Sequence, residues 1–408
     1  MLPLRHIRVM QSVARFGGVR SATDALLRVP SSISRSVALL EAAVGAALFE
    51  RKGHGMLPTP TGELVLTRYA RIRDELSAVL EEAAAAAGAG GLPAASLDTV
   101  YDERRLLAAS LLAEVRHMPG AGRRLGVSQP AVSAAIARLE NALRHKLFLR
   151  SARGVMPTEL GERWIQRFDR VLAELRHLES DVGALQGRMT GLITVGALPL
   201  PRTHILPRAI SALRAVHPGL RIHSLESPYE QLLAGLISGK VDFIIGAVRP
   251  VNDRTLTVEP LFNDELGVLA ASSHALASRR RVGLADLRGQ SWVLSRPGTP
   301  LRASLDAFFV AHGETAPVPA VETGDLALVR GLLMDGGMLT VLSTSQMRYE
   351  VNAGDLCVLP VSLEGLNRQI GITTRSGALL PAGVHAMLAE IRRASPRARG
   401  GRAPVTGN

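Results

Sequence analysis

Apolar and polar positions follow two different periods along this chain, and the change of period divides it into two halves. Up to about residue 185, apolar residues recur every three or four positions, which predicts amphipathic helices. From residue 189 onward, strand-like segments such as 192–197 alternate with helix-like segments. The pattern therefore predicts a mainly helical N-terminal half followed by an α/β half.

One stretch of the helical half, residues 127–140, predicts a short helix with a buried stripe and a slim polar front. Ser128 before Gln129 and Pro130 suits an N-cap and the first helical turn. Val132, Ile136 and Leu139 mark the stripe, and the small residues opposite them form a face that a DNA major groove can admit. Residues 147–158 then predict a short strand and a basic turn, a wing placed to contact phosphates. The plainer alternative is a structural amphipathic helix that happens to open with Ser-Gln-Pro.

The first 90 residues repeat the pattern of the next hundred at an offset of 99 positions. The offset requires no gap, and it pairs these matches: Ala22 with Ala121, Leu26 with Leu125, Leu40 with Leu139, Glu41 with Glu140, Leu48-Phe49 with Leu147-Phe148, and Pro58-Thr59 with Pro157-Thr158. Self-similarity at a fixed offset predicts two copies of one structural unit. A long helix is expected after each copy, over 60–87 and 160–185, and an alanine- and glycine-rich joint begins at residue 83.

Composition narrows the class of partner. The chain has 408 residues, one cysteine and a formal net charge of +12, so polyanions attract it. An aromatic content of 3% argues against binding single strands through stacked bases and favours double-stranded DNA. A single cysteine suits a reducing cytosol, no apolar run approaches the roughly 20 residues that span a bilayer, and the first residues lack a secretion signal. We therefore expect a cytoplasmic protein without a membrane partner.

Residues 127–140, together with Leu147-Phe148, Arg150 and the Pro-Thr-Glu-Leu-Gly run at 157–161, resemble the winged helix-turn-helix of LysR-type transcriptional regulators. The first copy lacks the family's Gln-Pro but keeps its Ser-Arg, whereas the second copy does the reverse. The resemblance implies base contacts from Ser34, Arg35, Gln129 and Ser133. It implies phosphate contacts from Arg51, Lys52, Arg150 and Arg153, and the expected DNA-binding set is completed by Ser31, Ser32, Ser128 and Pro130.

The α/β half resembles the effector domain of the same family, a two-lobed fold of the type 2 periplasmic-binding-protein kind. The matches are the segment from Gly196 to Leu200, the G-x-x-D strand at 239–246 and the glycine-led strand at 336–342. Within the family, the segments 196–199, 296–302 and 371–375 look closest to the galactose-binding-protein regulator subgroup. The resemblance implies a small polar effector in the cleft between the lobes, a sugar or a carboxylate. The expected contacts are Leu198, Pro199 and Thr203 from one lobe and Ser295, Thr299, Thr323 and Thr340 from the other, although a single serine or threonine is more often a turn or cap residue.

The sequence as a whole predicts an α/β, two-lobed effector domain preceded by two mainly α winged helix-turn-helix domains. The expected domains are a first winged helix-turn-helix at 1–62, a linker helix and joint at 63–96, a second winged helix-turn-helix at 97–161, a linker helix at 162–188, the effector domain at 189–395, and a disordered basic tail at 396–408. Linker helices pair chains in the family, so we expect a homodimer or homotetramer.

The expected function is ligand-responsive transcriptional regulation by DNA binding. A binding or carrier protein with vestigial DNA-binding modules is the first alternative, and an enzyme on the same two-lobed fold is the second. No Walker loop, H-E-x-x-H or G-x-S-x-G run is present, so we expect no catalysis, cofactor or metal.

Overall fold

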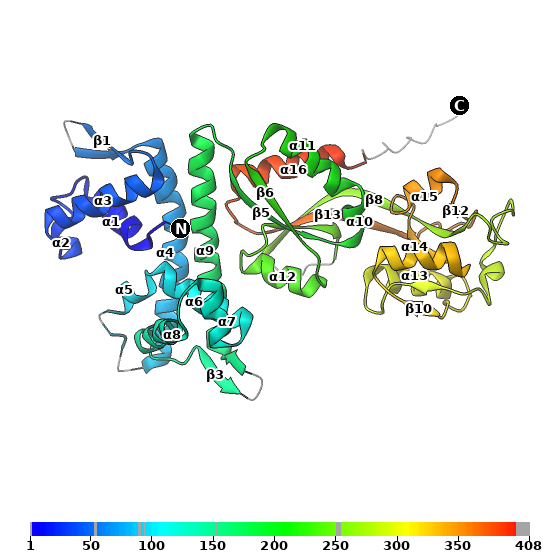
Figure 1. The fold of residues 1–408 in the computed structure, drawn as a ribbon, viewed down its shortest axis with the longest axis horizontal. Helices are drawn as coiled ribbons and strands as arrows, with labels where there is room; N and C mark the ends of the chain where they lie inside the picture. The colour runs from blue at the N-terminus through cyan, green and yellow to red at the C-terminus, as the bar shows by residue number, and fades with distance from the viewer. Residues whose placement is uncertain are drawn as a thin grey trace, which may run out of the picture.

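The protein is described here by a computed structural model, which covers residues 2–52, 55–88, 91–93, 95–151, 154–249 and 254–396; the side chains of residues 51, 52 and 151 lie outside the description. Within the N-terminal half, the same order of elements occurs twice (Figure 1). The first set is α1 Leu4–Phe16, α2 Thr23–Leu26, α3 Pro30–Val44, β1 Phe49–Lys52, β2 Gly55–Pro58 and α4 Pro60–Ala87. After α5 Ser96–Val100, the second set is α6 Glu103–Val115, α7 Met118–Leu125, α8 Gln129–Leu143, β3 Phe148–Ser151, β4 Gly154–Pro157 and α9 Glu159–Leu185. We call residues 4–58 head 1 and residues 103–157 head 2.

Each hairpin is fixed to the long helix that follows it by the same local chemistry. The hydroxyl of Thr59 accepts a hydrogen bond from the backbone of Gly62 at 3.1 Å, and Thr158 does the same for Gly161 at 2.9 Å. A Cβ on Gly161 would lie 2.1 Å from the carbonyl oxygen of Leu147, so only glycine permits this approach of helix to strand. These caps explain why α4 and α9 begin where the sequence predicts.

The second helices of the two heads differ in length. Helix α7 of head 2 has 8 residues, whereas its counterpart α2 in head 1 has only 4. Pro119 does not interrupt α7, because proline is compatible with a first helical turn, and the Nδ1 atom of His117 caps the helix by accepting a hydrogen bond from the backbone of Gly120 at 3.0 Å.

The two long helices α4 and α9 pack against each other within one chain. Arg68 of α4 contacts Glu174, whereas Glu82, further along α4, contacts Trp164, which comes earlier in α9, so the helices run antiparallel. One continuous hydrophobic cluster contains the buried residues of both heads and both helices, including Ile72 and Phe168. The apolar stripe of α9, which was expected to pair with a second chain, is covered here by α4 of the same chain.

The C-terminal half has two lobes that share one sheet, whose strand order is β11-β8-β13-β7-β5-β6. Lobe I contains β5 Gly191–Ala197, α10 Pro199–Thr203, α11 Ile205–Val216, β6 Leu220–Leu225, α12 Tyr229–Ile237, β7 Phe243–Ala247 and α16 Ala382–Ala394. Lobe II contains η2 Leu284–Leu287, β9 Val293–Leu294, α13 Pro300–Ala311, β10 Val321–Glu322, α14 Leu326–Gly336, β11 Thr340–Ser343, α15 Arg348–Ala353 and β12 Leu356–Val358. The strands β8 Leu256–Ala271 and β13 Asn367–Arg375 join the lobes, as Figure 1 shows.

The two-lobed architecture confirms the predicted fold class. In lobe I, β5 pairs in parallel with β6 and β7, and α11 and α16 cover one face of these strands through a core that includes Val195 and Met387. Strand β8 is a single strand of 16 residues that pairs with β13 and then with β11 and β12. Within the described residues, no helix is both long and apolar enough to cross a membrane.

Candidate nucleic-acid interface and effector-domain sites

Helix α8 has the buried stripe and slim polar front that the sequence predicts. The hydroxyl of Ser128 caps it by accepting a hydrogen bond from the backbone of Ala131 at 3.4 Å. Val132 and Ile136 lie in the core, whereas Gln129 and Ser133 are exposed, as are Ser128 and Pro130. A short helix that exposes an amide and small hydroxyls over a fixed apolar base has the shape of a major-groove reader.

Helix α3 of head 1 exposes a different set of side chains on the same scaffold. Ser31, Ser32, Ser34 and Arg35 are exposed, while Ile33, Val37 and Leu40 are buried. The N-cap of α3 is Val29, which makes no side-chain capping bond, so the first turn depends on Pro30 for its conformation. Head 1 thus presents a guanidinium near the second turn of its helix, where head 2 has Ala134.

A glutamate ties each of these helices to its hairpin, and it is buried in head 2 and half-buried in head 1. The carboxylate of Glu140 accepts hydrogen bonds from the backbone of Leu147 at 3.0 Å and of Phe148 at 3.2 Å. Glu41 does the same for Leu48 at 2.8 Å. The reading helix and the wing of each head therefore move as one unit. The repeat had paired these two glutamates, but their positioning role could not be seen from the sequence.

The predicted phosphate contacts are described only in part. Arg150 is exposed on β3, beside the turn of the second wing. Arg153 lies outside the described residues, and Arg51 and Lys52 belong to β1 while their side chains lie outside the description. Arg138 is exposed on α8 one turn beyond Ala134, and sequence reasoning missed it because the family signature there does not include arginine.

In lobe I, the predicted effector contacts gather where β5 ends and α10 begins. The backbone of Leu198 donates to the carbonyl of Ile245 on β7 at 3.0 Å, which fixes the turn. Pro199 is exposed as the first residue of α10, and the hydroxyl of Thr203 donates to the carbonyl of Leu200 at 2.8 Å. The carboxyl ends of parallel strands are the usual ligand edge of an α/β sheet, although Thr203 is engaged in a local bond.

In lobe II, the four predicted contacts lie together around the end of β9. Thr299 caps α13 and donates to the hydroxyl of Ser295 at 3.0 Å. Thr340 is buried and donates to the carbonyl of Val293 at 2.7 Å, while the hydroxyl of Thr323 accepts from the backbone of Asp325 at 3.0 Å. Thr323 and Thr340 are buried, whereas Ser295 and Thr299 are partly exposed, so Ser295 and Thr299 are the better placed of the four to contact a ligand.

A histidine connects the two lobes directly. The guanidinium of Arg348 on α15 donates to the Nε2 atom of His204, between α10 and α11, at 2.9 Å. Partial burial lowers the pKa of His204, and the nearby charges of Arg348 and Arg208 lower it further. A neutral imidazole is the form that accepts this hydrogen bond, so the contact is strongest when His204 is unprotonated.

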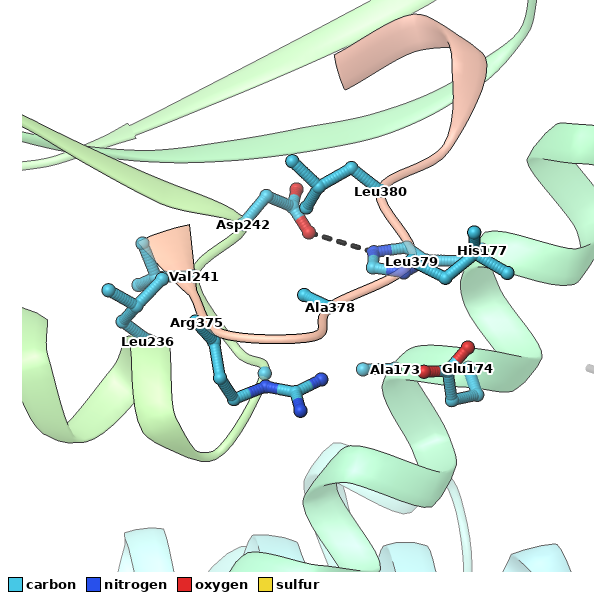
Figure 2. Close-up of a pocket in the computed structure, with 11 residues that line it drawn as sticks. Ala173, Glu174, His177, Leu236, Val241, Asp242, Arg375, Ala378, Leu379 and Leu380 are labelled. Carbon is cyan, nitrogen blue, oxygen red and sulfur yellow. Dashed lines mark hydrogen bonds and ion pairs between the residues drawn. The ribbon is translucent and has the colours of Figure 1, made fainter. Parts of the chain in front are cut away.

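The joint between α9 and lobe I surrounds the pocket drawn in Figure 2, where Glu174, His177, Asp242 and Arg375 lie among apolar side chains. The Nε2 atom of His177 on α9 lies 2.8 Å from a carboxylate oxygen of Asp242, whose other oxygen accepts from the backbone of Thr194 on β5 at 2.7 Å. Asp242 is the aspartate of the predicted G-x-x-D strand. Its carboxylate holds the strand and the linker helix together, so the resemblance identified a residue of the joint between the linker helix and lobe I.

Arg68 extends this joint to the first linker helix. Its guanidinium donates to Glu174 at 2.6 Å and to Asp181 at 2.5 Å, both on α9, and to the carbonyl oxygen of Leu379 in the loop before α16 at 2.6 Å. The side chain is 0% exposed. Three parts of the chain, α4, α9 and the effector domain, therefore meet on one buried cation, which sequence reasoning missed.

Groups suited to redox or metal chemistry are not assembled in the described part of the chain. No cluster of three or more His, Cys, Asp or Glu side chains is placed there to hold a metal ion. Burial raises the pKa of the Cys357 thiol on β12, which disfavours the reactive thiolate.

Comparison with known proteins agrees with this architecture. Residues 186–396 match the LysR substrate binding domain, and residues 4–63 and 104–162 match the bacterial regulatory helix-turn-helix protein, lysR family. The HTH-type transcriptional regulator GalR of Pseudomonas putida is 41% identical over 390 residues, which cover 95% of this chain and 96% of that protein.

Two solved structures share the fold. Full-length OxyR from Pseudomonas aeruginosa gives a TM-score of 0.57 at 24% identity and covers 74% of this chain and 98% of its own. CbnR, a LysR family transcriptional regulator, gives 0.53 at 20% identity and covers 72% and 99%. The relatives are transcriptional regulators and not enzymes. The chain belongs to the LysR family of bacterial transcriptional regulators, ligand-responsive proteins that bind DNA.

Proposed function

We propose that this regulator reads DNA with two winged helix-turn-helix heads, which are two copies of one module. The observation that carries the proposal is the front of each reading helix. Both α3 and α8 expose polar side chains, led by Arg35 and Gln129, over a buried apolar stripe, and each is tied to its hairpin by a glutamate carboxylate. The domain boundaries expected from the sequence, with heads at 1–62 and 97–161, belong to this proposal.

The comparisons support two heads in a specific way. OxyR and CbnR are covered almost completely, yet about a quarter of this chain has no counterpart in them. That share is close to the 99-residue repeat, which is one head together with the linker helix and joint that follow it. The alignment with GalR, by contrast, covers nearly all of both chains and so includes both heads. The same relative supports a place in its subgroup, although its name does not state an effector.

The effector in this proposal is a small polar molecule, a sugar or a carboxylate, bound between Pro199 of lobe I and Ser295 with Thr299 of lobe II. These groups lie at strand ends and at a helix start, where hydrogen-bond donors are available. Binding there would change the relative placement of the lobes, and the polar joint at Asp242 would carry that change to α9. The protein acts where DNA is, in the cytoplasm, and its assembly beyond one chain involves the effector domains.

Binding of the full chain to the DNA upstream of its own gene tests the proposal. Fluorescence anisotropy across a salt series is expected to show sequence-preferring binding whose logarithm falls linearly with the logarithm of salt concentration. Arg35→Ala and Gln129→Ala are each expected to reduce the preference over competitor DNA. Arg280→Ala, which removes an exposed charge from lobe II, serves as the control. Binding without sequence preference would favour a small-molecule binding protein with vestigial heads.

A further inference from the structure

The interface between α4 and α9 is reciprocal, which is the signature of a two-fold axis inside one chain. Arg68 of α4 pairs with Glu174 of α9 at 2.6 Å. The 99-residue offset converts these two positions into Arg167 and Glu75, and those two residues also form an ion pair, at 3.0 Å. An interface in which residue i contacts j while the equivalent of j contacts the equivalent of i is the kind that two identical subunits form around a two-fold axis.

The reciprocity is not limited to one pair of contacts. Two further sets obey the same rule: Arg71–Glu174 with Glu75–Arg170, and Arg68–Asp181 with Glu82–Arg167. Six ion pairs thus reduce to three contacts made twice. The buried apolar residues of both helices fill the space between them within one hydrophobic cluster, so the pairing has a core as well as a polar rim.

We propose that a single chain is a complete two-headed DNA reader, its heads paired in cis about this internal axis, and that it recognises an inverted repeat with two unlike halves. The proposal rests on the function proposed above. Figure 1 shows β1 and β3 at opposite ends of the paired helices α4 and α9. Heads related by a two-fold axis meet half-sites of opposite orientation on one face of the duplex, a whole number of helical turns apart.

The unlike halves follow from the unlike reading helices. Head 1 presents Arg35 where head 2 has Ala134, and head 2 presents Gln129 where head 1 has Pro30. Arginine pairs best with guanine in the major groove and glutamine with adenine. The half-site of head 1 is therefore expected to depend on a guanine, and that of head 2 on an adenine.

The effector domain also makes the two linker helices unequal. It covers Arg68, whose side chain is 0% exposed, but leaves the equivalent Arg167 29% exposed. The carbonyl oxygen of Leu379 bonds Arg68 at 2.6 Å from the effector domain. One bound chain is therefore oriented on its operator, with the effector domain joined to one side of the head pair.

Stoichiometry is the first test. The full chain is mixed with a duplex that contains one two-half-site operator, and the complex is weighed by native mass spectrometry. With the duplex in excess, a one-to-one ratio of chains to operators is expected, including in complexes whose chains are joined through their effector domains. Two chains per operator would overturn the proposal while leaving DNA recognition intact, whereas the absence of any sequence-preferring complex would refute the underlying function.

Symmetrised operators test the unlike halves. Duplexes that carry two copies of the head 1 half-site, or two copies of the head 2 half-site, are compared with the natural operator. Each symmetrised duplex is expected to bind roughly tenfold or more weakly, because one bidentate base contact is lost. Equal or tighter binding to either symmetrised duplex would overturn the assignment of unlike half-sites.

Cross-linking separates pairing in cis from exchange of α4 between two chains. In a Cys357→Ser background, the partners Glu75 and Arg170 are replaced by cysteines, Glu75→Cys and Arg170→Cys, and joined with a short bis-maleimide. A product with the mass of one chain is expected. A covalent dimer would show that α4 pairs with the α9 of a second chain, and the single-cysteine variants control for random linkage.

Discussion

Replacing Arg68 is expected to destabilise the head pair far more than replacing its repeat equivalent Arg167. Both arginines bind two carboxylates on the opposite linker helix. Arg68 is fully buried and also donates a hydrogen bond to the carbonyl oxygen of Leu379, so Arg68→Ala leaves buried acceptors without a partner. Breaking a buried ion pair in this way costs about 3–5 kcal/mol, and the lower end applies because Arg71 still pairs with Glu174 at 2.5 Å.

The expected loss for Arg167→Ala is smaller, about 1 kcal/mol, because water reaches its partly exposed carboxylate partners. For a unit the size of the head pair, roughly 2–4 °C of melting temperature corresponds to 1 kcal/mol. Arg68→Ala is thus expected to lower the melting temperature by about 6–12 °C. Arg68→Met, which keeps the side-chain volume, should cost nearly as much if the lost charge contacts are the cause.

The chain has two tryptophans, so tryptophan fluorescence can follow the unfolding of the head pair separately from that of the effector domain. Trp164 is buried in α9 and donates to Glu82, whereas Trp292 is buried in lobe II. In a Trp292→Phe background, the fluorescence of Trp164 follows the unfolding of the head pair alone. Equal melting temperatures for the Arg68→Ala and Arg167→Ala proteins would refute the argument that burial by the effector domain sets the difference.

Four further predictions concern single groups. Leu27 is 92% exposed and has a φ of 51° at a helix end where head 2 has Gly126. Because this backbone conformation is strained for leucine, Leu27→Gly should raise the stability of the head pair by about 0.5–1 kcal/mol. An unchanged melting temperature of the head pair would contradict the strain at Leu27. Asp242→Asn should lower the stability of the effector domain by about 2 kcal/mol, because buried hydrogen bonds to a carboxylate are lost. An unchanged melting temperature, followed by the fluorescence of Trp292, would contradict this. The pKa of His204 is lower in the folded protein than its unfolded value of about 6.5. The contribution of His204 to stability is therefore complete above a pH of about 6.5 and is lost as the pH falls through the folded pKa. The melting temperature of the effector domain should drop on acidification in the wild type and drop less in His204→Gln. The raised pKa of Cys357 predicts slow labelling by a thiol reagent at pH 7 until the protein is unfolded, and rapid labelling of the native chain would contradict its burial.

Much of the fold was accessible from the sequence because its signals are local. The 99-residue offset, the cap at Ser128 and the stripe of Val132, Ile136 and Leu139 depend on residues close together in the chain, and the structure confirms the helices that they predict. The two-lobed fold of the effector domain followed from the family resemblance, but the order of its strands in the sheet did not. Local periodicity could not give the length of α7. Pro119 and Gly120 often interrupt a helix, but here the proline lies in the first turn and His117 caps that turn.

The partner of an apolar face is not a local property, so the sequence could not show what covers α9. The pattern of α9 shows that one face is buried but does not show whether a second chain or α4 of the same chain covers it. Arg68 was the available signal, because it lies three residues beyond Val65 and four before Ile72, inside the buried stripe of α4. A charge at such a position indicates a carboxylate partner in a protein interior. The sequence also could not show that the hydroxyls of Thr203 and Thr340, which were expected to contact the effector, donate hydrogen bonds to backbone carbonyls of the protein itself.

A hydroxyl-radical footprint of the full chain on its operator is the most direct test of the account that both heads read DNA. The wild-type protein is expected to protect two half-sites on one face of the duplex. Arg35→Ala should weaken protection of one half-site and Gln129→Ala that of the other. Loss of both half-sites together with either variant, or protection of one half-site alone by the wild type, would contradict two independent reading heads on one chain.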